Sequence, residues 1–473
     1  METERLILQK IPGLRVFWTA YDPLDLANDS IDPLGFMAGY VALADRILPG
    51  FTTITTVPRY AGMLCLALKQ ARETVGDSGG ESFMARRRKI VEHMKSFERA
   101  WALACGLAAR EGRIGEPATD GLRGVMAVRR WLDLHANKRT ISLAFSLLAN
   151  QVRYGGIGAY GAFLEALHLA DMNALTLRPA GEELGQAFPS PGGHGLAIFH
   201  DDARLPVDGL RAWGIEACAG MLTMAEAKLL RDALSGGEEA EFDDNTRWAM
   251  LRLLNTCDPE EKMEEPRLLL ACLRRLKQNT AADLSMPEQS ARRICSALRV
   301  IEPYERMFQC AAFLFDQVRA AALGHGEVEL PTVGSSAAVQ SAAKELRSTA
   351  AKFVEEVEKA TDAPDGLGPA RQGLQKLKLV DLARSLASTA EPVAVCQNIL
   401  RRHIRVQEGK FDSGVRKQPW VQLDDADTGQ MARLTAQRFG LEPSQVRESW
   451  TKMARHPYRT FGARRFIRQC KIR

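Results

Sequence analysis

One segment constrains the fold more than any other, because its apolar residues repeat at alternating steps of four and three. Over residues 336–360 this stripe consists of Val339, Ala343, Leu346, Ala350, Phe353 and Val357. Such spacing puts all of them on one face of an α-helix, where they must pack against another helix. Residues 361–369 are rich in turn formers, and residues 371–387 carry a second leucine stripe. We therefore predict an antiparallel helical hairpin over residues 335–400.

The stripe has two interpretations that the sequence leaves open. If the hairpin projects as a stalk, Val339, Leu346, Phe353 and Val357 are candidate partner-binding residues, and the chain is a scaffold or adaptor that binds only protein. If the hairpin belongs to a bundle, the same residues form core.

Helical spacing of apolar residues recurs along most of the chain, and strand patterns are short and few. The predicted fold class is mainly α: a multi-domain helical protein with a winged-helix-like segment and a small mixed basic C-terminal module. Stretches rich in Gly and Pro mark the boundaries. The predicted domains are an N-terminal helical domain (1–112), a winged-helix-like domain (120–190), a helical bundle (196–330), the hairpin (335–400) and the basic module (401–473).

Composition excludes several classes of protein. Residues are 46% hydrophobic and 26% charged, as in ordinary globular proteins. No apolar run reaches the ~18 residues that a membrane helix needs, and the first residues lack a signal-peptide core, so we expect no membrane partner. The nine cysteines form no C-x-x-C pair, which argues against a disulfide framework or a zinc site. We expect a cytoplasmic protein without a metal or other cofactor.

Residues 141–188 follow the outline of a winged helix-turn-helix. A helical pattern ends at Tyr154, a Gly-Gly turn follows, and a second helical pattern leads into a short strand and a further helix over 173–188. The expected recognition helix, residues 157–168, carries no Lys or Arg, which major-groove readers usually have. The segment is therefore expected to contact phosphates non-specifically or a protein, or else to be two ordinary bundle helices.

Charge is distributed unevenly along the chain. Residues 401–473 hold 17 Lys and Arg against 7 Asp and Glu, a balance of +10, so the first 400 residues carry −5 of the total of +5. This asymmetry predicts an acidic or phosphate-bearing partner for the tail. Within the tail we expect a strand over 420–424 and helices over 429–438 and 443–453.

The tail contains three basic clusters with interleaved aromatic residues, among them Tyr458, Phe461 and Phe466. Cations neutralise phosphates and aromatic rings stack on bases, so the clusters predict an interface with double-stranded DNA. The alternative is a solvated basic face or a patch that docks on an acidic protein. The candidate nucleic-acid-binding residues are Arg401, Arg402, Arg405, Lys410, Arg416, Lys417, Arg455, Arg459, Arg464, Arg465 and Arg468.

Three strings suggest catalysis or cofactor binding. Residues 76–80 spell G-D-S-G-G, but no His precedes residue 93, as the serine-protease order would require. Residues 156–161 match G-x-G-x-x-G, but they follow a helical pattern and not a buried strand. Glu260 and Lys262 form an E-x-K triplet downstream of two aspartates, which keeps a metal-dependent nuclease open as an alternative.

Two separated pieces of the chain resemble an uncharacterised bacterial family. Residues 32–35 (D-P-L-G) precede residues 48–60 (L-P-G-F-T-T-I-T-T-V-P-R-Y), and the latter match an [F/L]-P-G-x-[ST]-x-[IL]-x-T-x-x-R-Y element. Some members share a later H-x-x-V-Q…P-W element, here His403 to Gln407 and Pro419-Trp420. The resemblance implies a component of antiviral defence or mobile-element loci and brings no established catalytic residue.

These observations together predict a non-enzymatic, DNA-engaging subunit of a multi-protein bacterial antiphage system. The basic tail would bind nucleic acid, and the helical body would bind partner proteins, with an ATPase or nuclease supplied by another chain.

Overall fold

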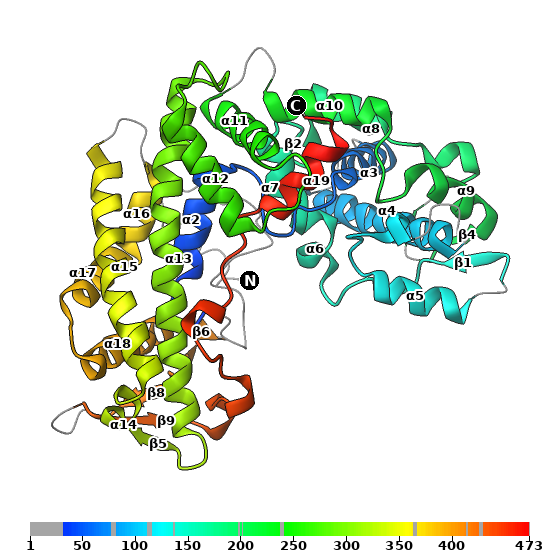
Figure 1. The fold of residues 1–473 in the computed structure, drawn as a ribbon. Coiled ribbons are helices and arrows are strands. Elements are labelled where there is room, and N and C mark those ends of the chain that lie inside the picture. The colour runs from blue at the N-terminus through cyan, green and yellow to red at the C-terminus, as the bar shows by residue number, and fades with distance from the viewer. Residues whose placement is uncertain are drawn as a thin grey trace. The chain divides into compact units, whose positions relative to one another are not determined.

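The computed structural model describes residues 32–76, 82–110, 116–135, 138–196, 199–200, 202–236, 241–362, 367–412, 415–424 and 429–472. Helices dominate these ranges, which confirms the predicted mainly α class (Figure 1). None of the helices described there has both the length and the apolarity to span a lipid bilayer.

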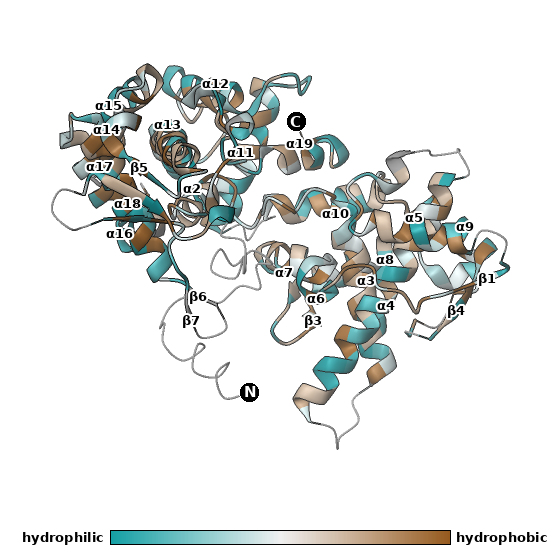
Figure 2. Ribbon diagram, turned by 90° about the horizontal axis from the view of Figure 1, so that it is seen from below, coloured by the Kyte–Doolittle hydropathy of each residue, from teal (hydrophilic) through white to brown (hydrophobic). Residues whose placement is uncertain are grey.

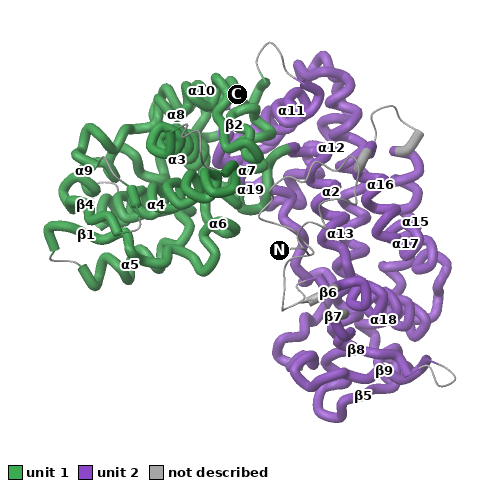
Figure 3. The backbone as a smooth tube through the Cα atoms, turned by 180° about the vertical axis from the view of Figure 1, so that it is seen from behind, with its two compact units in different colours: residues 1–20, 50–237, 468–471 green, residues 21–49, 238–467, 472–473 purple. Residues whose placement is uncertain are grey.

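Contacts group the chain into two compact units, coloured separately in Figure 3. Unit 1 comprises residues 1–20, 50–237 and 468–471, and unit 2 comprises residues 21–49, 238–467 and 472–473. Five successive domains were expected from the sequence. The expected bundle over residues 196–330 is divided between the two units, because helices near residues 210 and 230 pack on earlier helices of unit 1.

Unit 1 is built from short helices around one long one. Its elements are α3 (Arg59–Val75), α4 (Phe83–Arg110), η1 (Glu116–Thr119), α5 (Val125–Leu134), β1 (Thr140–Ser142), α6 (Gln151–Tyr154), α7 (Gly156–Ala166), β2 (Ala170–Asp171), β3 (Thr176–Leu177), α8 (Pro179–Ala187), η2 (Pro191–His194), β4 (Arg204–Pro206), α9 (Val207–Ala217) and α10 (Met224–Ser235).

The core of unit 1 surrounds the second half of α4, where residues 96–108 are all buried. A helix that is buried on every side must be covered by other helices, and α3 and α9 pack against it. The ring of Trp101 lies 4.8 Å from that of Tyr60 on α3, and the ring of Phe97 lies 5.6 Å from that of Trp213 on α9.

The winged-helix prediction is not confirmed. A helix, a small hairpin and a further helix do follow one another as α7, β2–β3 and α8, but each hairpin strand has only two residues. Strand β1 pairs with β4 and not with the hairpin. The expected recognition helix, α7, is buried from Gly156 to Leu164. A recognition helix must expose one face to a DNA groove. Because α7 is buried, it is a core helix and not a recognition helix.

Unit 2 contains the longest helix and most of the strands. Its elements are α2 (Met37–Ile47), α11 (Phe242–Cys257), α12 (Glu265–Gln278), α13 (Glu288–Ala322), β5 (Glu327–Glu329), α14 (Leu330–Gly334), α15 (Ala337–Asp362), α16 (Pro369–Lys376), α17 (Leu379–Ser388), α18 (Pro392–Glu408), β6 (Phe411–Asp412), β7 (Val415–Arg416), β8 (Val421–Leu423), β9 (Met431–Leu434), η4 (Gln437–Phe439), η5 (Pro443–Gln445), η6 (Trp450–Lys452) and α19 (Thr460–Gln469), whose last residues belong to unit 1.

Helix α13 is the centre of unit 2, and Figure 2 views it nearly end-on with α11, α15 and α18 around it. Helix α15 packs against both α13 and α17. Its predicted stripe is buried: Val339, Leu346 and Phe353 are 0% exposed and Val357 is 3% exposed. The prediction that these four residues bind a partner protein is therefore corrected, because they already pack inside unit 2. The second half of the predicted hairpin consists of two helices, α16 and α17, which are separated at Lys378, where φ is 52°.

The C-terminal residues contain less helix than expected. Strand β8 confirms the strand predicted over 420–424, and β9 replaces the helix predicted over 429–438. Strand β9 lies between β5 and β8 in an antiparallel sheet and buries Ala432 and Leu434 on one face, a period of two that suits a strand. Short 3₁₀ turns replace the helix predicted over 443–453.

Candidate nucleic-acid interface

The third basic cluster, which begins at Arg455, is mostly neutralised within unit 2. Arg455 pairs with Glu302 at 2.8 Å, Arg464 pairs with Asp258 at 2.6 Å, and Arg459 pairs with Asp45. Arg459 and Arg465 are buried, whereas Arg468 is exposed. The prediction that these arginines form a DNA-binding face is therefore wrong for Arg455, Arg459, Arg464 and Arg465. Acidic groups earlier in the chain are the partners of Arg455, Arg459 and Arg464.

The aromatic residues of this cluster do not form a stacking surface either. Tyr458 and Phe466 are buried, and only Phe461 is exposed, at 71%. The hydroxyl of Tyr458 donates a hydrogen bond of 2.7 Å to the carboxylate of Glu305, which is fully buried in α13. The same carboxylate accepts hydrogen bonds of 2.9 Å from the backbone N–H and the Nδ1 of His456. These contacts attach the C-terminal segment to α13.

Helix α18 presents two of its arginines to solvent and buries the third. Arg401 and Arg405 are exposed, one turn apart on the same face. Arg402 is buried and donates to the carbonyls of Leu34 (2.9 Å) and Leu377 (2.7 Å). The sequence grouped Arg402 with Arg405, but the exposed pair is Arg401 and Arg405.

Two lysines join these arginines at the end of α18. Lys410 Nζ donates to the carbonyl of Asp32 at 2.7 Å, and the backbone N–H of Lys417 donates to the carbonyl of Lys410 at 3.0 Å across the β6–β7 hairpin. Burial lowers the pKa of Lys410, and the nearby charges of Lys417 and Arg402 lower it further. Burial also lowers the pKa of Arg402, with Arg405 adding repulsion. We call Arg401, Arg402, Arg405, Lys410 and Lys417 the α18 cluster.

The side chain of Arg416 lies outside the described residues, although its backbone forms part of β7 next to Lys417. The first two predicted basic clusters thus come together, and the third does not join them.

The two pieces of the later resemblance element meet beside the α18 cluster. His403 is fully buried; its Nδ1–H donates to the carbonyl of Pro33 at 2.9 Å, and its Nε2 accepts the N–H of Trp420 at 2.8 Å. Gln407 donates to the same Pro33 carbonyl at 3.4 Å. Burial lowers the pKa of His403 to about 4. This histidine therefore serves as a neutral connector between residues 32–35 and β8.

The earlier resemblance element is likewise a folding element. Arg59 and Glu226 form a fully buried ion pair of 3.1 Å, and Arg59 also donates to the carbonyl of Glu216 at the end of α9 (2.9 Å). The ring of Tyr60 stacks on that of Tyr160 at 4.7 Å, and its hydroxyl accepts the N–H of Arg123 at 3.0 Å. Arg59 and Tyr60 fasten helices of unit 1 to one another.

The remaining strings gain no catalytic geometry. Residues 77–80 of G-D-S-G-G lie outside the described residues. The N-terminus of α7, where G-x-G-x-x-G would bind a phosphate, is occupied by buried Glu98, whose Oε1 accepts the N–H of Gly156 at 2.7 Å. Glu260 and Lys262 pair with each other at 2.5 Å in an exposed loop. Across the described ranges, no three His, Cys, Asp or Glu side chains gather in a way that could hold a metal ion.

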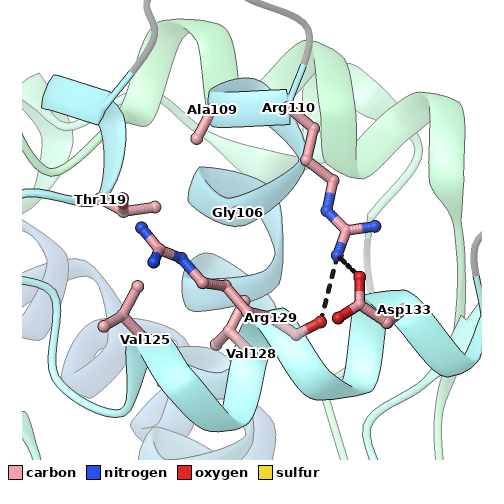
Figure 4. A pocket seen from close by; sticks show the side chains of 8 residues that line it. All are labelled: Gly106, Ala109, Arg110, Thr119, Val125, Val128, Arg129 and Asp133. Carbon is pink, nitrogen blue, oxygen red and sulfur yellow. Dashed lines mark hydrogen bonds and ion pairs between the residues drawn. The ribbon is translucent and has the colours of Figure 1, made fainter.

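A cavity of about 370 Å³ lies between α4 and α5 in unit 1. Figure 4 shows Arg129 extending beside Thr119 while Arg110 turns toward Asp133. Arg110 pairs with the Asp133 carboxylate at 2.5 Å and donates to the carbonyl of Arg129 at 3.1 Å. One of its two cations, Arg110, is therefore already neutralised by Asp133.

A second cavity, of about 300 Å³, lies in unit 2 beside residues 32–34. Its wall contains His456, which contacts the buried carboxylate of Glu305, and neither residue is among the site residues predicted from the sequence. Glu305 carries no distinguishing sequence signal, because the charged residues Arg299, Glu302 and Arg306 stand within six positions of it.

Comparison with known proteins identifies no relative of this chain. No protein-family model, no curated protein and no solved structure matches the chain.

Proposed function

We propose that this chain binds nucleic acid through phosphate contacts at the α18 cluster, as a non-enzymatic, DNA-engaging subunit of a multi-protein bacterial defence assembly. The observation that carries the proposal is that Arg401 and Arg405 are exposed one turn apart on α18, while half-buried Lys417 lies near Lys410 at the end of that helix. Phosphate binding needs several cations on one surface and no base contacts.

The anchoring of the cluster supports this function physically. Arg402 and Lys410 donate to the backbone carbonyls of residues 32–35 and so hold α18 and the β6–β7 hairpin against the start of α2. The exposed cations therefore sit on packed elements and lose little conformational freedom when they bind a phosphate. The resemblance to proteins of antiviral defence and mobile-element loci supports the assembly context.

Salt dependence measures how many phosphates the cluster contacts. Three cations reach solvent, and each neutralised phosphate contributes about −0.9 to the slope of log affinity against log salt. We expect a slope of about −2.7 for a short DNA duplex, so that affinity falls roughly 40-fold between 50 and 200 mM salt. Fluorescence anisotropy of a labelled duplex gives this slope directly.

Charge reversal then locates the interface. The double variant Arg401→Glu, Arg405→Glu should abolish duplex binding at 100 mM salt. The matched control is Arg438→Glu, Arg447→Glu, which reverses two exposed arginines of the same C-terminal region outside the cluster. Equal binding by the two double variants would contradict the proposal, and an affinity for protein but not for DNA would favour the scaffold alternative.

A further inference from the structure

The 300 Å³ cavity of unit 2 contains a buried histidine that is oriented like a functional group. It is lined by residues 32–34, by Met37 of α2, by one face of α13 and by residues 454–457. Positions 308, 312, 315 and 316 of α13 are spaced by four, three and one, so they form a single helical face. The volume lies at the lower end of small-molecule sites, which span roughly 300–1,000 Å³.

His456 contacts a buried carboxylate through one of its two ring nitrogens. It is 6% exposed, stacks on Tyr40 at 4.8 Å, and donates its Nδ1–H to the fully buried carboxylate of Glu305 at 2.9 Å. The carboxylate oxygens of Glu305 accept, so the hydrogen of this contact is on Nδ1 and Nε2 is the nitrogen left for the cavity. Among the described residues, no protein donor reaches that Nε2. A side chain this deeply buried, with one nitrogen left for the cavity, indicates a ligand.

Three further polar side chains line the cavity, namely Asp32, Asp316 and Arg455, and the guanidinium of Arg455 pairs with Glu302 at 2.8 Å. One oxygen of Asp316 accepts from Arg319 at 3.0 Å, and within the described ranges no donor reaches the second oxygen. Burial raises the pKa of this carboxyl. Both carboxylate oxygens of Asp32 are occupied by the N–H groups of Phe36 and Met37, so they cap α2 and do not bind a ligand.

Two of the apolar residues that line the cavity are aromatic. Phe308 and Phe315 line the cavity from the same face of α13 as Asp316, and the ring of Phe308 lies 4.2 Å from that of His456. Flat rings of this kind favour a planar ligand by stacking. A complementary ligand is thus a planar ring of limited size with hydrogen-bond donors along its edge.

We propose that this cavity binds an amino-substituted aromatic heterocycle such as an adenine base, with His456 Nε2 and the Asp316 carboxylate accepting its donors. The base can come from a free nucleoside or from an unpaired position in a nucleic-acid strand. The inference rests on the cavity and not on the α18 cluster, so either proposal can fail while the other stands.

Adenosine and purine riboside, which lacks the amino group, are the probes. Calorimetric titration of the full chain should show adenosine binding at least about tenfold more tightly, because only adenosine has an amino group that can donate a hydrogen bond to the Asp316 carboxylate. Asp316→Asn should remove most of that preference and leave purine riboside unaffected. Equal affinity for the two compounds, or no adenosine binding at millimolar concentration, would overturn the inference.

A cavity-filling variant guards against indirect effects. Ala312→Phe places a ring in the cavity, whereas Ala321→Phe adds the same ring at an exposed position of the same helix. Only Ala312→Phe should abolish adenosine binding, with the circular dichroism of both variants unchanged.

If Ala312→Phe also weakens binding of single-stranded oligo(dA) but not of oligo(dT), the base comes from a strand. If oligonucleotide binding is untouched, the ligand is a free nucleoside. Adenosine binding that survives Ala312→Phe contradicts the site.

Discussion

The buried histidine of α18 makes the stability of unit 2 depend on pH in a defined window. His403 accepts the N–H of Trp420 at Nε2 and donates from Nδ1 to the carbonyl of Pro33. Protonation would place a proton on the nitrogen that accepts and would charge a side chain that is 0% exposed. Burial therefore lowers the pKa of His403 from 6.5 to about 4, and the cations of Lys410 and Arg319 act in the same direction.

The sign and size of the effect follow from proton linkage. In the unfolded chain the imidazole protonates near pH 6.5, whereas in the folded chain it stays neutral down to about pH 4. The unfolded state binds more protons between these values, so the contribution of His403 is complete above pH 6.5 and is lost as the pH falls toward 4. The difference between the two pKa values corresponds to about 3 kcal/mol of unfolding free energy.

The comparison of wild type with His403→Gln isolates this contribution, because glutamine does not titrate and all other groups cancel. Urea unfolding followed by circular dichroism at pH 7, 6, 5 and 4 gives the free energy of unfolding for both proteins. We expect the variant to be less stable at pH 7 and the wild-type advantage to shrink by about 3 kcal/mol by pH 4. A wild-type advantage that stays constant over this range would refute the assignment of His403 as a buried neutral connector.

Three further predictions concern packing and reactivity. Arg59→Met should cost about 3–5 kcal/mol in thermal or urea unfolding because it leaves the buried Glu226 carboxylate unpaired, and the double variant with Glu226→Leu should recover most of the loss. Cys257 should be alkylated by iodoacetamide before the other eight cysteines, since a hydrogen bond from Cys272 lowers its pKa; peptide mass spectrometry would identify a different first site if this is wrong. Gly39→Ala should destabilise unit 2 by about 1–3 kcal/mol, because the new Cβ would lie 2.5 Å from a buried tyrosine hydroxyl; an unchanged melting temperature would contradict this packing.

Periodicity determined the helical character of the chain but not the partners of its helices. The alternation of four and three over residues 336–360 predicts α15 and the face that it buries. It does not say whether that face meets another protein or another part of the same chain, because both interactions require the same apolar stripe. The packing of α13 and α17 against α15 shows that the stripe meets other helices of the same chain.

Charge shows the same division between sequence and tertiary structure. The basic excess after residue 400 is a property of the sequence, and it correctly marks Arg401, Arg405 and Lys417 as surface cations. Arg459 and Arg464 look equivalent in the sequence, yet they pair with Asp45 and Asp258, which lie more than 200 positions away. A count of charges cannot contain such pairings, because long-range contacts form only when the fold brings distant acids and bases together. For the same reason His456 becomes a candidate ligand group only beside Glu305, 151 residues earlier in the chain.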